Sequence, residues 1–306
     1  MLWQTADPYD QAARAHKGGP TDGSAAKRSP LSCGSVDAQT FLGMEQVGDS
    51  LHWRMVAEPH LTTPGNFLFG GCGLGAALVA LEGASGRPTV WATAQYLSYA
   101  PVNSVVEWEV TLAVVGGHVS QGRAVGSVDG SEILTVNAAL GKDDLEAGGI
   151  WVQPPRVPPP EASPPRFLPA MFRNTIMDSV EVRTAKGRTF EELHGETGDP
   201  NSALWARVPG HLSPSAATLA IFGDYVSGAV SQPLGRRAMG RSLDNTLRVV
   251  ELRDTEWVLC DIRMHALVGG YGQGIAFLWS QDGHLLATAS QTMAVRLWPD
   301  DMEIPG

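Results

Sequence analysis

Two polar side chains in the second half of the chain have no counterpart in the first half, although an internal repeat relates the halves. Asp244 is the only acidic residue between positions 238 and 250, and Gln291 lies among small residues. The equivalent positions of the first half hold Gln95 and Ala138. A carboxylate can take a proton from a reacting group, and an amide can orient that group. The difference therefore predicts one active site per chain.

These residues also have structural interpretations. Asp244 could cap a turn at a strand end, and Gln291 could bond to a neighbouring loop. His265 could donate to a water molecule or share the role of base with Asp244. A single histidine on a strand is, however, more often structural. The residues alone leave both interpretations open for all three positions.

The internal repeat itself is visible in paired dipeptides. Gly86-Arg87 recurs as Gly235-Arg236, and Glu107-Trp108 recurs as Glu256-Trp257 at the same separation. An apolar segment precedes each copy, and segments with strand-like patterns follow each copy. A long-range repeat of this kind indicates one unit that has been duplicated and fused.

Each half is expected to contain one helix and several strands. The helices are predicted over residues 69–84 and 215–231, and both are apolar on nearly every face, so a sheet must surround them. The predicted strands cover residues 50–56, 91–99, 104–115, 119–128, 132–140, 179–184, 203–208, 243–251, 256–267, 271–279 and 285–297. Two such units can join their sheets edge to edge. The pattern predicts an α+β double hotdog: two tandem units, each a curved antiparallel sheet wrapped around one long apolar helix.

Composition divides the chain further and limits its partners. We expect a flexible arm over residues 1–34, a first unit over 35–141, a proline-rich linker over 142–172, and a second unit with the active site over 173–300. A net charge of −10 and a pI near 5.2 argue against a nucleic-acid partner.

The cysteines and the apolar runs bear on location. Cys33, Cys72 and Cys260 have neither metal-site nor redox-motif spacing, and so few cysteines suit a reducing compartment. No apolar run reaches the roughly 18 residues of a membrane span. The chain also lacks a basic-then-apolar signal pattern. We expect a cytoplasmic protein without a membrane span.

Three motifs resemble those of the acyl-CoA thioesterase II family. Leu68-Phe-Gly-Gly71 is similar to that family's Val-Phe-Gly-Gly, and Leu243-Asp-Asn-Thr246 is similar to its Ile-Asp-His-Ser segment. The stretch from Gln281 to Gln291 is similar to its closing Asp-Gly-x-Leu-Val-Ala-Ser-x-x-Gln. The resemblance covers about residues 41–141 and 176–298.

The resemblance implies a set of catalytic residues. In that family an Asp, a Ser or Thr, and a Gln of the second unit hold the hydrolytic water. The Asp carries over onto Asp244 and the Gln onto Gln291, whereas His265 stands where the hydroxyl residue is expected. Thioester hydrolysis needs no strong general acid, since a thiol with a pKa of about 8.5 leaves readily as thiolate.

Two further parts of the sequence could contact the substrate. Gly70 and Gly71 open a helix, and their N–H groups could bind a thioester oxygen or a coenzyme A phosphate. They could equally allow close helix–sheet contact. Arg123 matches a family arginine and could contact a phosphate, or it could be a solvated surface side chain.

The function implied is hydrolysis of medium- or long-chain acyl-CoA, within fatty acid metabolism. We expect no cofactor and no metal, an acyl-CoA substrate as partner, and a homo-oligomer. An enoyl-CoA hydratase on the same fold would need an Asp-x-Asn-Pro-x-His segment, and residues 244–248 lack its Pro and His. The remaining alternative is a non-catalytic acyl-CoA or lipid-binding hotdog protein.

Overall fold

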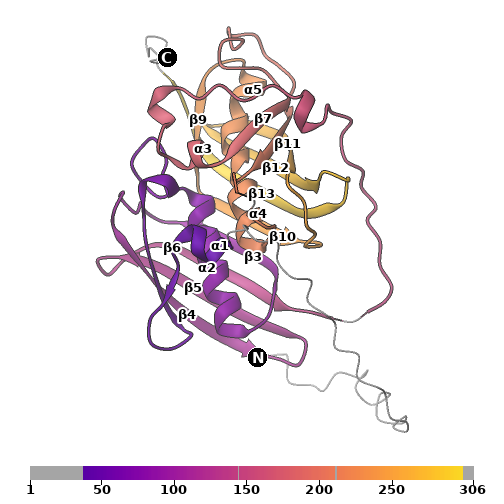
Figure 1. The fold of residues 1–306 in the computed structure, drawn as a ribbon. Helices are drawn as coiled ribbons and strands as arrows, with labels where there is room; N and C mark the ends of the chain where they lie inside the picture. Colours follow the sequence, from indigo (N-terminus) through magenta and orange to yellow (C-terminus); the bar gives the residue numbers. More distant parts are fainter. Residues whose placement is uncertain (1–36, 144, 211, 299–306) are drawn as a thin grey trace. The chain divides into compact units, whose positions relative to one another are not determined.

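A single large antiparallel sheet organises the chain. The structure, a computed structural model, describes residues 37–143, 145–210 and 212–298, so the predicted arm over residues 1–34 lies outside the described residues. The sheet has thirteen strands in the order β1-β2-β4-β5-β6-β3-β10-β13-β12-β11-β8-β7, and β9 pairs with β13 (Figure 1). Neighbouring strands are antiparallel throughout.

The strands of the first half lie on one side of the sheet. They are β1 (Glu45–Gln46), β2 (His52–Val56), β3 (Thr89–Tyr96), β4 (Val105–Val115), β5 (Val119–Val128) and β6 (Ser131–Gly141). The predicted hairpin between β5 and β6 is confirmed, because Asp129 and Gly130 have φ values of 50° and 75° between the paired residues Val128 and Ser131. Two positive φ angles match the twist of the flanking strands.

The strands of the second half continue the sheet. They are β7 (Glu181–Lys186), β8 (Asn201–Arg207), β9 (Ala238–Ser242), β10 (Asp244–Val249), β11 (Val258–Val268), β12 (Tyr271–Ser280) and β13 (Leu285–Leu297). The short strands β1 and β9 were not predicted from the sequence. A strand of two residues leaves no alternation to detect, and β9 interrupts its own pattern with Gly240.

Pairing of β3 with β10 joins the two sets of strands. Asn245 lies opposite Ala94, and Thr246 lies opposite Thr93. The hydroxyl groups of Thr93 and Thr246 are 2.8 Å apart and share a hydrogen bond. Cross-strand threonine pairs of this kind stabilise a sheet modestly. The halves therefore share one hydrogen-bonded ladder.

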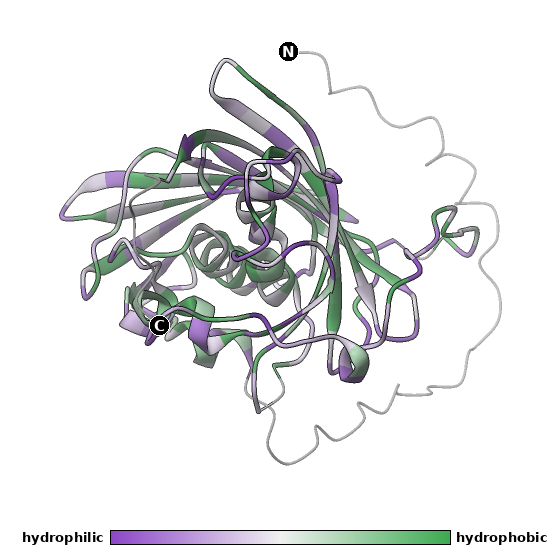
Figure 2. Ribbon diagram, turned by 90° about the horizontal axis from the view of Figure 1, so that it is seen from above, coloured by the Kyte–Doolittle hydropathy of each residue, from purple (hydrophilic) through white to green (hydrophobic). Residues whose placement is uncertain are grey.

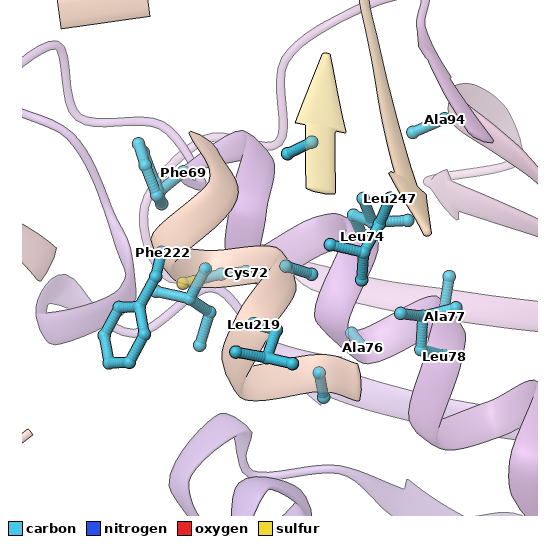
Figure 3. Packing of buried hydrophobic residues seen from close by; sticks show 14 of the residues in the cluster. Phe69, Cys72, Leu74, Ala76, Ala77, Leu78, Ala94, Leu219, Phe222 and Leu247 are labelled. Carbon is cyan, nitrogen blue, oxygen red and sulfur yellow. The ribbon is translucent and has the colours of Figure 1, made fainter. Parts of the chain in front are cut away.

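Helix α2 (Gly70–Ser85) is the longest helix of the described residues and occupies the segment predicted to be helical. Its side chains pack against β4, β5 and β6 on one side and against α4 (Ala216–Gly223) on the other. Cys72 and Ala76 of α2 face Leu219 and Phe222 of α4 in the common apolar core (Figure 3). Both helices lie against the same face of the curved sheet (Figure 2).

The second predicted helix is not continuous, which corrects the expectation of one long helix in each half. After α4 the chain tightens into a 3-10 turn, η5 (Asp224–Val230), and then a short helix, α5 (Ser231–Leu234). The change occurs at Asp224, whose N–H bonds to the carbonyls of both Ile221 and Phe222. A single charged residue inside an apolar segment marks this break in the sequence.

The proline-rich segment has no long regular element. Its described residues before Pro160 are irregular, and only two single 3-10 turns follow, η3 (Pro160–Ala162) and η4 (Ala170–Phe172). The carbonyl of Pro158 accepts a 2.9 Å hydrogen bond from the indole N–H of Trp205. Val157 packs against a separate apolar cluster around Trp205.

The short helix α3 (Ile176–Ser179) and the turn η2 (Pro59–Leu61) contact one another, and α1 (Ala38–Leu42) packs on α2.

Close approach of α2 and α4 depends on glycine. A Cβ atom at Gly75 would lie 3.0 Å from the carbonyl oxygen of Ala217, which is backbone and cannot turn aside. We predict that Gly75→Val separates the helices and lowers the free energy of unfolding by about 1–3 kcal/mol, the usual cost of overpacking. Gly117→Val is the matched control, because nothing lies within 4 Å of a Cβ at that position. Equal urea midpoints for the two variants would contradict this account.

Candidate active site

A buried carboxylate that sequence reasoning missed lies where α4 gives way to η5. Asp224 is 2% exposed. Its Oδ2 accepts a 2.6 Å hydrogen bond from the backbone N–H of Gly71, and its Oδ1 accepts one from Nε2 of Gln291. Nδ2 of Asn245 is 3.4 Å from Oδ1. Nε2 of Gln291 also donates to Oγ of Ser242 over 3.2 Å. An acid, a hydroxyl and an amide are thus brought together.

The pleat of the sheet explains why these side chains converge. Ala289 of β13 faces α4, since a Cβ atom built on Gly223 of α4 would lie 2.9 Å from the Cβ atom of Ala289. Gln291 lies two residues further along the strand and therefore on the same face. Ser242 of β9 is paired with Met293 of β13, so it too belongs to that face. Asn245 shares the face through its pairing with buried Ala94.

Gly70 and Gly71 bring the N-terminus of α2 against this carboxylate. A Cβ at Gly71 would lie 2.9 Å from the carbonyl oxygen of Ala220, from Cα of Ile221 and from Cβ of Asp224. The glycine therefore permits close contact between two helices, rather than between a helix and the sheet. It also leaves its N–H directed at Asp224, where the helix dipole favours negative charge.

Burial controls the ionisation of Asp224. Loss of water contact raises the pKa of this carboxyl from an ordinary 3.8 to about 7. The hydrogen bonds from Gly71, Gln291, Asn245 and Ser242 act in the opposite direction by stabilising the charged form. A carboxyl that titrates near neutral pH can serve as a general base there, whereas an ordinary aspartate is too weak a base.

Three buried polar atoms around Asp224 have no hydrogen-bond partner among the described residues. They are Oε1 of Gln291, Oδ1 of Asn245 and the hydroxyl oxygen of Tyr96. Buried polar groups are nearly always paired in native proteins, with protein, water or ligand. Two acceptors and one hydroxyl beside a carboxylate are suited to hold a water molecule and a polar substrate group.

Asp244, the acid predicted from the sequence, lies on the other face of the sheet from Gln291. It is paired with exposed Gln95, whereas the next residue, Asn245, faces the helices. The carboxylate of Asp244 accepts a 2.7 Å hydrogen bond from the backbone N–H of Thr292. The structure therefore brings Gln291 together with Asp224, and not with Asp244.

The other predicted residues lie apart from Asp224. His265 is exposed and lies at an irregularity in the pairing of β11 with β12, two strands away from β13. Arg123 of β5 is exposed, and its Nε donates to Oγ1 of Thr135 over 2.9 Å. The roles proposed for them from the sequence remain predictions.

One feature of the sequence could have identified Asp224 as a candidate site residue. It is the only charged residue in the apolar segment 215–231, and Gly75 is its counterpart in the repeat. A charge on an apolar helix is costly to bury unless it is bonded. Because the predicted helix is apolar on nearly every face, its one carboxylate was not expected to have a role.

The described residues contain no cluster of three or more His, Cys, Asp or Glu side chains that could hold a metal ion. Within the same part of the chain, no helix combines the length and the apolar character needed to cross a membrane.

Comparison with known proteins identifies the family of the chain. Residues 154–295 match the family described as the acyl-CoA thioesterase C-terminal domain. A candidate thioesterase from Novosphingobium aromaticivorans is 31% identical with a TM-score of 0.74, and the match covers 82% of this chain and 97% of that one. No curated protein sequence matches significantly.

Two further solved structures share the fold at lower identity. A hotdog protein of unknown function from Alicyclobacillus acidocaldarius is 21% identical with a TM-score of 0.73, covering 86% of this chain and 98% of that one. The acyl-CoA thioesterase II of Mycobacterium marinum is 19% identical with a TM-score of 0.67, covering 87% and 100%. The extent and identity of the Novosphingobium match, together with the family match in the second half, show that the chain belongs to the acyl-CoA thioesterase II-like family of hotdog proteins.

Proposed function

We propose that this protein hydrolyses acyl-CoA thioesters with Asp224 as the general base. The observation that carries the proposal is the bonding of Asp224, a buried carboxyl whose pKa is raised to about 7, to Gln291 and to the first turn of α2. The Asp, Ser and Gln that the family resemblance implies are then Asp224, Ser242 and Gln291. In this proposal Asp224 takes the role that sequence reasoning gave to Asp244.

The reaction would proceed by direct attack of water. Asp224 takes one proton from a water molecule while the water oxygen forms a bond with the thioester carbonyl carbon. The carbonyl electrons move onto oxygen, near the N–H of Gly70 at the positive end of α2. Collapse of this intermediate breaks the carbon–sulfur bond, and coenzyme A leaves as thiolate. The second proton stays on the attacking oxygen, and Oε1 of Gln291 is placed to accept a hydrogen bond from that O–H group.

The non-catalytic alternative explains these features less well. A protein that only binds acyl-CoA has no need for a buried carboxylate, which costs stability whenever it is ionised. Three unpaired buried polar atoms around that carboxylate add to the cost. Strongly perturbed pKa values such as that of Asp224 cluster at functional sites.

The finer features of the function belong to the same proposal. We take residues 35–141 and 173–300 as two tandem hotdog units that share one sheet, because each contributes an antiparallel set of strands and a buried helical segment. The substrate would carry a medium or long acyl chain, since the surroundings of α2 are largely apolar. A cytoplasmic homo-oligomer is the accompanying expectation.

Removing the proposed base should abolish most turnover. We predict that Asp224→Asn lowers kcat/KM for acyl-CoA by at least about a hundredfold, the usual scale for loss of a general base. The assay is thiol release from acyl-CoAs of graded chain length. Asp244→Asn is the matched control, and its activity should stay within a few-fold of wild type. The opposite ranking would return the base to Asp244, and activity in both variants would end the proposal.

The raised pKa of Asp224 also has a consequence for stability. Because the folded state favours the protonated carboxyl, this group's contribution to stability is largest below pH 3.8 and is lost as pH rises through about 7. The asparagine side chain of the Asp224→Asn variant does not ionise in this pH range. Between pH 5 and pH 8 the wild type should therefore lose on the order of 2–3 kcal/mol of unfolding free energy relative to this variant. Urea unfolding of both proteins at the two pH values measures the difference, and an unchanged difference would show that Asp224 is not shifted.

A further inference from the structure

In addition to the backbone N–H of Gly71, the first half of the chain brings the polar side chain of Tyr96 close to Asp224. Tyr96 is the last residue of β3, and its backbone N–H donates a 3.0 Å hydrogen bond to the carbonyl of Leu243 in the second half. Ala92 and Ala94 precede it at alternate positions and are buried against the helices. The pleat therefore directs the side chain of Tyr96 toward the same face as Asn245.

The Tyr96 hydroxyl and the Asp224 carboxylate both lie next to Gly70. A Cβ atom on Gly70 would lie 3.0 Å from the Tyr96 hydroxyl oxygen and 2.9 Å from Oδ2 of Asp224. Both oxygen atoms therefore border one small region beside the first residue of α2. A side chain at position 70 would collide with both groups, so glycine allows them to lie this close to the start of α2.

The Tyr96 hydroxyl is buried and makes no hydrogen bond of good geometry to a described residue, although the side chain of Asn245 lies beside it. Its pKa lies well above the usual value, first because of burial and then because of the nearby carboxylates of Asp224 and Asp244. It therefore remains protonated at neutral pH and can only act as a hydrogen-bond donor or a neutral acceptor. A protonated donor next to a base is what a carbonyl oxygen needs as it gains charge.

We propose that the Tyr96 hydroxyl donates a hydrogen bond to the thioester carbonyl oxygen, so that the N-terminal half completes the active site of the C-terminal half. The inference rests on the function proposed for Asp224. As water attacks, its oxygen bonds to the carbonyl carbon, one proton passes to Asp224, and the carbonyl electron pair moves onto oxygen. Tyr96 stabilises that oxyanion without giving up its proton. The carbon–sulfur bond then breaks, and the thiolate leaves.

In this proposal the shared sheet positions catalytic groups from both halves of the chain. The base and the amide come from α4, η5 and β13, whereas the oxyanion donor comes from β3. Pairing of β3 with β10 fixes the distance between them. The repeat places Asn245 at the position equivalent to Tyr96, and these two residues meet across the junction of the halves.

The test compares two tyrosines with buried, unpartnered hydroxyl groups. Tyr96→Phe removes the proposed donor and should lower kcat for decanoyl-CoA by about a hundredfold, the lower end for loss of one oxyanion donor. Tyr225→Phe is the control, since that ring packs on Phe69 and beneath the Arg166 guanidinium, and its kcat should stay within threefold. Circular dichroism and urea unfolding establish that both variants fold.

Two further readouts separate oxyanion binding from a structural role. The thioether S-decyl-CoA has no carbonyl oxygen, so its inhibition constant should be the same for wild type and Tyr96→Phe. The acid limb of the pH–rate profile should keep its midpoint, because Asp224 remains the base. The inference is wrong if Tyr96→Phe keeps kcat within threefold of wild type, or if Tyr225→Phe loses as much. It is also wrong if Tyr96→Phe binds S-decyl-CoA more weakly than wild type, or if a shift of the acid limb accounts for its loss of rate.

The two proposals fail in distinguishable ways. If Asp224→Asn is inactive while Tyr96→Phe retains full kcat, Asp224 stays the base and only the role of Tyr96 is wrong. If Asp224→Asn retains activity, the proposed function fails first, whatever Tyr96→Phe does.

Discussion

The hydrogen bond between the Gly71 N–H and the Asp224 carboxylate is the constraint on which the site depends. It ties the start of α2 to the point where α4 ends, across the contact between two helices from different halves. The bond requires glycine at position 71, because a Cβ there would collide with the backbone of α4. This hydrogen bond stabilises the ionised form of Asp224 and so offsets part of the effect of burial, which favours the protonated carboxyl. Helix packing and acid–base chemistry are therefore set by the same contact.

The sheet supplies the other half of the arrangement. Gln291 and Ser242 reach Asp224 because β13 pairs with both β12 and β9, and because the pleat places their side chains on the helix-facing side. The β3–β10 pairing adds Tyr96 and Asn245 from opposite sides of the junction. One continuous ladder thus fixes groups that are far apart in the sequence. In the proposed mechanism a duplicated chain keeps a single site, to which one copy provides the base and the other a neutral donor.

Much of this architecture could be predicted from the sequence, because strand alternation and hairpin signals are local. The expected strand over residues 285–297 coincides with β13, and the Asp129-Gly130 turn was found from its dipeptide. Gln291 was singled out as a polar residue without a counterpart in the first half, and its amide bonds to Asp224. Asp224 was missed because its role depends on a helix break and on a partner 153 residues away. Asp244 was chosen by motif, although alternation within β10 puts its neighbour Asn245 on the helix-facing side.

Hydrolysis in the proposed mechanism depends on a buried carboxyl that ionises near neutral pH. The most direct test is the pH dependence of kcat/KM for acyl-CoA in the wild-type protein between pH 4.5 and pH 9, which reports the ionisation of the free enzyme's base. We expect kcat/KM to rise about tenfold per pH unit at acid pH and to level off at about pH 7, the raised pKa of Asp224. A profile that is already flat from pH 5 upward would contradict this expectation, since the base would then titrate as an ordinary solvent-exposed carboxylate.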